Sequence, residues 1–238
     1  MSHSVNPADI KAIDPLEDGF YSRVILADGI PIKAHADVSD EAMLEAARRI
    51  SRLLQNIPVV RDNLIARGAE HHIIAVNQQC SDLPEWRHMK GESVTDRTGT
   101  GKMLFDDRVR GMGGIISSSG EDNLLQLPDE RYTDHRDICT HEFAHGIQMG
   151  GMSENVVRAF EEQHGRARGL WPSYAGTNEH EYFAELTMWY FGTRGDYGAI
   201  DPEPEPGAEW LKQHDPAGYA LIDDFYAGRL PVQRIVET

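Results

Sequence analysis

Apolar residues recur along the chain with two different periods, and these periods divide it into strands and helices. Residues 20–26 and 30–35 alternate apolar and polar side chains on either side of Asp28-Gly29, which predicts a β-hairpin. After Ser39 the apolar residues return every three or four positions as far as about residue 55. This period predicts an amphipathic helix over 39–55 that Ser39 caps.

The middle of the chain contains shorter elements. Pro58 is placed to begin a helix that ends near Gly68. Residues 71–76 predict a buried strand, and residues 111–119 predict a strand rich in glycine. Residues 123–128 predict a further short strand that Pro128 ends.

Helical periodicity dominates the second half of the chain. Apolar residues mark one face of a predicted helix that Asp134 or Asp137 caps and Gly150-Gly151 end: Ile138, Phe143, Ala144, Ile147 and Met149. Further helices are expected from Ser153 to about residue 164, over 177–191 and over 216–227. Residues 201–207 alternate proline with acidic residues and predict a stiff loop. Strands that come before helices favour an α+β fold, with residues 1–15 as a tail and residues 16–238 as a single domain.

The predicted helix that begins near residue 138 contains the sequence His141-Glu142-Phe143-Ala144-His145. Residues four apart share a face of a helix, so both imidazoles can reach one metal ion. Glu142 lies about 100° around the helix, where it can hold a water molecule that the metal activates. This pattern indicates a zinc hydrolase, in which Glu142 is the general base.

Catalytic zinc requires a third protein ligand. The predicted helix over 177–191, capped by Thr177 or Asn178, has Glu181 and Glu185 one turn apart beside an apolar stripe of Phe183, Leu186 and Tyr190. Acidic side chains at an apolar border are costly unless a cation compensates them. Glu181 is therefore a candidate ligand, and Glu185 can hold the second ring nitrogen of a ligand histidine. Glu179 and His180 compete with Glu181, because periodicity alone does not choose among them.

These two segments, together with Tyr174 between them, resemble the catalytic core of the anthrax lethal factor group of gluzincin metallopeptidases. The likeness covers roughly residues 138–190, with Ala144 where that group has glycine. It implies a zincin-like fold with a small mixed sheet before the motif helix, a helical lobe after it and the metal between them. It further implies that His141, His145 and Glu181 bind Zn²⁺.

The resemblance also implies roles for the surrounding residues. Glu142 would be the base, Tyr174 would stabilise the oxyanion, and Glu185 would support a ligand. In zincin folds a strand such as that predicted over 111–119 often pairs with an extended substrate. The expected partner is accordingly a peptide or a small amide. The likeness does not extend to the substrate-recognition regions of the toxin.

Composition narrows the function further. The net charge is −16. Proteins that bind nucleic acids or anionic membranes need basic surfaces, so neither partner is expected. The first 15 residues lack the pattern of a signal peptide, and no apolar run is long enough for a membrane span. The expected location is cytoplasmic, unless a signal peptide was removed. Cys80 and Cys139 are then expected to be reduced thiols.

Three other functions fit parts of the same pattern. The site could serve an enzyme that acts on a small non-peptide metabolite. Two histidines and a carboxylate also form the facial triad of non-haem iron enzymes. A binding module could keep the metal without catalysis. The acid at position 142 favours hydrolysis over the last two, because neither requires a general base there.

Overall fold

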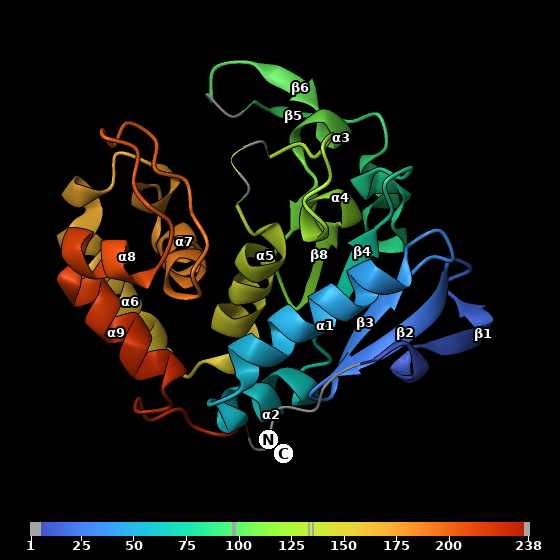
Figure 1. Cartoon of the computed structure of the whole chain (residues 1–238), viewed down its shortest axis with the longest axis horizontal. Coiled ribbons are helices and arrows are strands. Elements are labelled where there is room, and N and C mark those ends of the chain that lie inside the picture. Colours follow the sequence, from blue (N-terminus) through green and yellow to red (C-terminus); the bar gives the residue numbers. More distant parts are fainter. Residues whose placement is uncertain (1–5, 97–98, 133, 135, 236–238) are drawn as a thin grey trace.

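A computed structural model describes residues 6–96, 99–132, 134 and 136–235. In the first half of the chain, a mixed six-stranded sheet has the order β1-β2-β3-β4-β8-β7 (Figure 1). The pairs β3–β4 and β4–β8 are parallel, and β1–β2, β2–β3 and β7–β8 are antiparallel. The strands are β1 (Lys11–Glu17), β2 (Tyr21–Ala27), β3 (Ile30–Ala34), β4 (Glu70–Ile74), β7 (Gly111–Met112) and β8 (Ile116–Gly120). A separate hairpin consists of β5 (Ser93–Thr95) and β6 (Lys102–Leu104).

Helices cover one face of the sheet. The amphipathic helix α1 (Asp40–Leu54) packs on β2 and β3, and α5 (Ile138–Gly146) packs on β8 and on α1. Ser39 caps α1 and Asp137 caps α5, each by accepting a hydrogen bond from a first-turn amide. The main hydrophobic core fills the space between these helices and the sheet and continues into the second half of the chain. The short helices of this part are α2 (Pro58–Ala66), α3 (Phe105–Arg108) and α4 (Glu121–Leu124).

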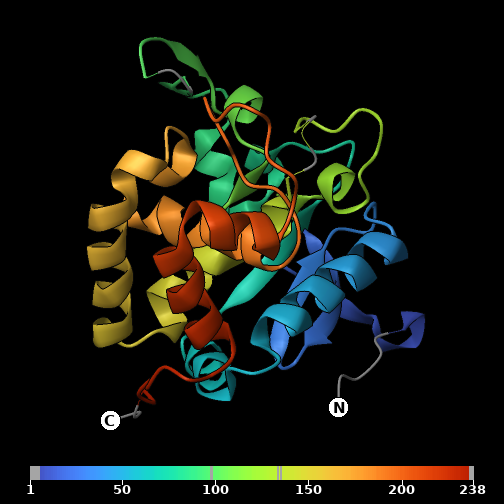
Figure 2. The same cartoon turned by 60° about the vertical axis from the view of Figure 1, so that its left-hand side comes forward.

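The second half of the chain forms a helical lobe beside α5, shown in orange and red in Figures 1 and 2. Its central helix is α7, which contacts α5 as well as the other three helices of the lobe. The helices of the lobe are α6 (Glu154–Ala167), α7 (Glu179–Tyr190), α8 (Ala208–His214) and α9 (Pro216–Tyr226). A π-helical turn over Ile147–Gly151 continues α5 towards this lobe. The predicted α+β class, with a mixed sheet before the motif helix and a helical lobe after it, is confirmed.

The structure differs from the sequence-based prediction in three places. Residues 7–15, expected as a tail, form a 3₁₀ turn at Pro7–Asp9 and most of β1, because this segment pairs with β2. Residues 111–119 do not form one strand, because the chain reverses at Gly113-Gly114 and gives the antiparallel pair β7–β8. The strand expected over residues 123–128 is absent from the described structure, and α4 occupies its first residues.

The reason for the third difference is a set of buried polar bonds around α4. The side chain of Asn123 accepts a hydrogen bond from the Ile138 amide, and Glu121 accepts from the amides of Ser39 and Val76. Residues two apart in a strand share one face, whereas the helical turn of α4 points Glu121 and Asn123 in different directions, towards their separate partners. Tertiary contacts therefore override the apolar pattern that favoured a strand.

Two smaller expectations concern cysteines and membrane spans. Cys80 and Cys139 are both buried and not joined in a disulfide, and burial raises the pKa of both thiols. Cys139 faces His71 in the core. Among the described residues, none of the helices combines the length and the apolar character that crossing a membrane requires.

Candidate metal centre

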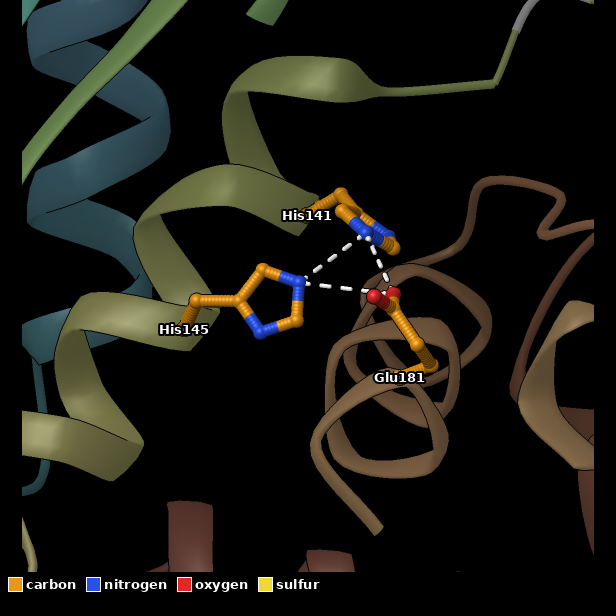
Figure 3. A group of neighbouring side chains, drawn as sticks. All are labelled: His141, His145 and Glu181. Carbon is orange, nitrogen blue, oxygen red and sulfur yellow. Dashed lines mark hydrogen bonds and ion pairs between the residues drawn. The ribbon is translucent and has the colours of Figure 1, made fainter. Parts of the chain in front are cut away.

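Two helices supply the residues of the centre. His141 and His145 lie one turn apart on α5, and Glu181 lies in the first turn of α7, where Asn178 caps the helix (Figure 3). Their side chains point towards one another across the space between α5 and α7. The sequence predicts this convergence through the helical spacing of the two histidines and through the resemblance that pairs them with Glu181.

The three candidate ligand atoms are spaced as tetrahedral coordination of one metal ion requires. Nε2 of His141 is 3.2 Å from Nε2 of His145 and 3.2 Å from Oε2 of Glu181, and His145 Nε2 is 3.4 Å from the same oxygen. Metal–nitrogen bonds of about 2.0–2.1 Å at tetrahedral angles would separate neighbouring donor atoms by about 3.3 Å. In the described part of the chain, this is the one group of three His, Cys, Asp or Glu side chains with ligand atoms within 4.8 Å of one another.

The charges of the carboxylates in this cluster also favour binding of a cation. Burial opposes ionisation of Glu181, but hydrogen bonds from His141 and His145 outweigh it and hold the pKa of this carboxyl far below its usual range. Burial likewise lowers the pKa of His141, yet its contacts with Glu181 and Glu185 raise that pKa well above the ordinary value. Without a metal, a proton on His141 partly balances the carboxylates. A divalent cation can replace this proton, so the residues present fit a zinc ion.

Glu142, the acidic residue of the histidine motif, lines a cleft that also contains His141, His145 and Glu181. Glu142 lines it together with Gly111 of the edge strand β7. Removal from bulk water raises the pKa of Glu142, and the histidines partly offset this effect. A carboxyl group whose pKa is shifted towards neutrality is suited to accept and return a proton.

Tyr174 also lines the cleft, from the 3₁₀ turn Tyr174–Gly176. Its ring is nearly parallel to that of His141, with 6.3 Å between the ring centroids. Partial burial, with the nearby carboxylate of Glu181, raises the pKa of Tyr174 to about 12. The hydroxyl is therefore protonated at neutral pH and can donate a hydrogen bond into the cleft.

The two competing ligands of the sequence analysis lie outside the cluster. The ring of His180 turns away from Glu181, and its Nδ1 is 2.8 Å from Oε1 of Gln148 in the π-helical turn. Glu179 lies beside His180, with 3.6 Å between its Oε1 and the histidine Nε2. Glu181 lies one turn before Glu185 on the face of α7 that is turned towards the histidines, whereas its neighbours Glu179 and His180 lie on other faces.

The cleft has a volume of about 520 Å³ and lies between the two halves of the chain. Its walls include Met112 and Gly113 from the segment that the sequence analysis expected beside a substrate, and three residues that it did not identify: Arg108, Arg136 and Asp196. Gly113 is required by a close approach, because a Cβ atom there would lie 2.5 Å from Cδ2 of His145. Arg136 and Asp196 come from loops and Arg108 from the short helix α3, where no periodicity marks a side chain as functional.

Comparisons with known proteins add little to this geometry. No protein-family model matches the sequence, and no curated protein matches it. Among solved structures, the fold resembles that of the Pro-Pro endopeptidase from Paenibacillus alvei, with 21% sequence identity and a TM-score of 0.49. The match covers 84% of this chain and 97% of the other. The interpretation of the centre therefore depends on its own residues.

Proposed function

We propose that this protein is a zinc-dependent hydrolase that cleaves amide bonds, most simply those of peptides. The observation that supports this function best is the set of three ligand atoms 3.2–3.4 Å apart, with Glu142 on the same helix as two of them. His141, His145 and Glu181 would hold the metal, and Glu185 would support His141. A bound zinc ion supplies acidity to a water molecule and polarises the carbonyl group of the substrate.

Glu142 is the proton carrier of the proposed reaction. Its carboxylate accepts a proton from the attacking water and delivers the proton to the amine that leaves when the amide bond breaks. The raised pKa of this carboxyl increases its basicity and helps it to accept that proton. Glutamine at this position would keep the size of the side chain but could not carry the proton.

Tyr174 and β7 would contact the substrate. The protonated hydroxyl of Tyr174 donates a hydrogen bond to the carbonyl oxygen as negative charge develops on it. Gly111 and Met112 line the cleft from β7, which is the last strand of the six-stranded sheet. An extended peptide can add to such an edge by main-chain hydrogen bonds.

The test compares wild-type protein with Glu142→Gln on a peptide library and on unlabelled casein. We expect wild-type protein to cleave and the variant to lose at least 1,000-fold in kcat while it keeps one zinc ion per chain, since a positioned acid–base group together with the orientation of the water contributes about this much. Cleavage by Glu142→Gln at the wild-type rate would overturn the proposal. A wild-type protein that holds iron in place of zinc would redirect it to oxidative chemistry.

A further inference from the structure

Glu185 is a fully buried carboxylate behind the candidate metal centre. It lies one turn after Glu181 on α7, with an exposed fraction of 0%. Its Oε1 is 3.4 Å from Nδ1 of His141. Within the described residues, neither of these two buried atoms has a hydrogen bond to any other group. The position of the Glu185 carboxylate therefore determines how the ring of His141 is held.

A turn of the helical lobe holds the second oxygen of this carboxylate. The main-chain amide of Asp196 donates a hydrogen bond to Oε2 of Glu185 over 2.6 Å. The preceding residue, Gly195, is buried directly against the same oxygen. A Cβ atom at Gly195 would lie 2.3 Å from Oε2 and 2.6 Å from Nε1 of Trp189, so the carboxylate or the turn would have to shift.

The same turn is linked to the segment that precedes α5. Oδ1 of Asp196 is 3.8 Å from a guanidinium nitrogen of Arg136, two residues before α5 begins. Arg136 is held in turn by Asp134, whose two carboxylate oxygens share one bifurcated hydrogen bond from its Nε–H. Both Arg136 and Asp196 line the cleft. The turn thus contacts both sides of the centre: Glu185 on α7 and the segment that leads into the histidine helix.

We propose that Gly195 and the main-chain amide of Asp196 are positioning elements of the metal centre, which fix the Glu185 carboxylate and through it the ring of His141. This inference rests on the proposed zinc site. The left-handed region of φ is not what requires glycine at position 195, because Gly195 does not have a positive φ. The requirement is the missing Cβ, which leaves room for Oε2. Partners that orient a metal-bound imidazole typically contribute 10–100-fold in metal affinity.

The first experiment measures zinc affinity by competition with a chromophoric chelator for wild-type protein, Gly195→Ala and Gly169→Ala. Gly169 is a matched control, because a Cβ atom there would meet nothing within 4 Å and φ is not positive. We expect Gly195→Ala to bind zinc about 10–100-fold more weakly. Gly169→Ala should match wild-type protein. The d–d absorption of the Co²⁺-substituted protein should change in Gly195→Ala alone, which a general loss of stability would not produce.

A second comparison tests whether the effect passes through Glu185. Glu185→Ala removes the oxygen that a Cβ at position 195 would meet, so adding Gly195→Ala to it should weaken zinc binding no further. If the shorter side chain prevents folding, Glu185→Gln is the background instead. Its neutral side chain has already lost the charge that faces Nδ1 of His141, so we expect less than a threefold further loss from Gly195→Ala there. If Gly195→Ala weakens zinc binding as much in the Glu185 variant as it does in wild-type protein, the positioning role is overturned.

The outcomes separate this inference from the proposed function. If wild-type protein binds zinc and Gly195→Ala binds it equally well with an unchanged Co²⁺ spectrum, the positioning inference alone is wrong. If wild-type protein binds no zinc, the proposed function is wrong and the inference falls with it.

Discussion

One buried carboxylate, Asp215, joins four segments of the helical lobe, and its replacement by asparagine gives a quantitative prediction. Asp215 is 1% exposed and precedes α9. Its Oδ1 accepts hydrogen bonds from the amide of Gly218 at 2.8 Å and from Gln163 at 3.4 Å. Its Oδ2 accepts from the Trp171 indole at 3.1 Å and from the Tyr182 hydroxyl at 2.5 Å. The last two residues flank the site, three positions before Tyr174 and one after Glu181.

Asparagine keeps the size of Asp215 but offers one oxygen where the aspartate offers two. If that oxygen keeps the Gly218 amide, the new amide group faces the indole N–H of Trp171, which can only donate. An unpaired buried polar group costs about 1–3 kcal/mol, and the lost charge-assisted bond to Tyr182 adds to this cost. We expect Asp215→Asn to lower the free energy of unfolding by about 3 kcal/mol, equivalent to roughly 6–12 °C in Tm for a chain of this size.

Urea and thermal unfolding, followed by circular dichroism, measure this loss. Asp223→Asn is the matched control: Asp223 lies on the same helix and bonds to Tyr190, but its side chain is 33% exposed and should cost less than about 1 kcal/mol. Trp171→Phe removes the stranded donor, so Asp215→Asn should cost less in that background. A loss below about 1 kcal/mol, or the same loss with and without Trp171→Phe, would refute the reasoning.

Two further predictions concern the cleft and the core. Tyr174→Phe should lower kcat about 100-fold while zinc content and KM change little, because the hydroxyl bonds mainly to charge that develops during the reaction. Steady-state kinetics on a cleaved peptide measures this effect, and an unchanged kcat would remove Tyr174 from the mechanism. Burial lowers the pKa of His71 to about 3, so the unfolded chain binds a proton there below about pH 6.5 that the folded chain does not bind. This group adds nothing to pH dependence above pH 6.5, and its neutral state costs stability as pH falls from 6.5 towards 3. Between pH 7 and pH 5 the loss is about 2 kcal/mol, so urea unfolding of His71→Gln should show a smaller drop over that interval than wild-type protein, and equal drops would contradict the assignment.

Much of the helical structure was predictable because its signals are local. Ser39 and Asp137 cap their helices through neighbouring amides, and the spacing of His141 and His145 alone places both on one face. The strand expected over residues 123–128 was wrong because Asn123 bonds to the amide of Ile138, far along the chain. A pattern of apolar residues carries no information about such a partner.

The site divides in the same way. Spacing and resemblance together predicted the three residues that the structure brings within contact distance. Periodicity alone left Glu181 and His180 open and only the resemblance favoured Glu181, because a sequence period does not set the orientation of α7. Gly195 and Asp196 carried no signal, because their contact with Glu185 arises from a turn of irregular backbone that periodicity does not describe.

The central claim is that α5 and α7 together bind one zinc ion. Its most direct test is metal content by mass spectrometry, on wild-type protein and on Glu181→Ala, both purified without added metal. We expect about one zinc ion per wild-type chain and a zinc content near zero in the variant, since two histidines alone leave the site a ligand short. Equal zinc in both proteins, or no metal in the wild-type protein, would contradict it.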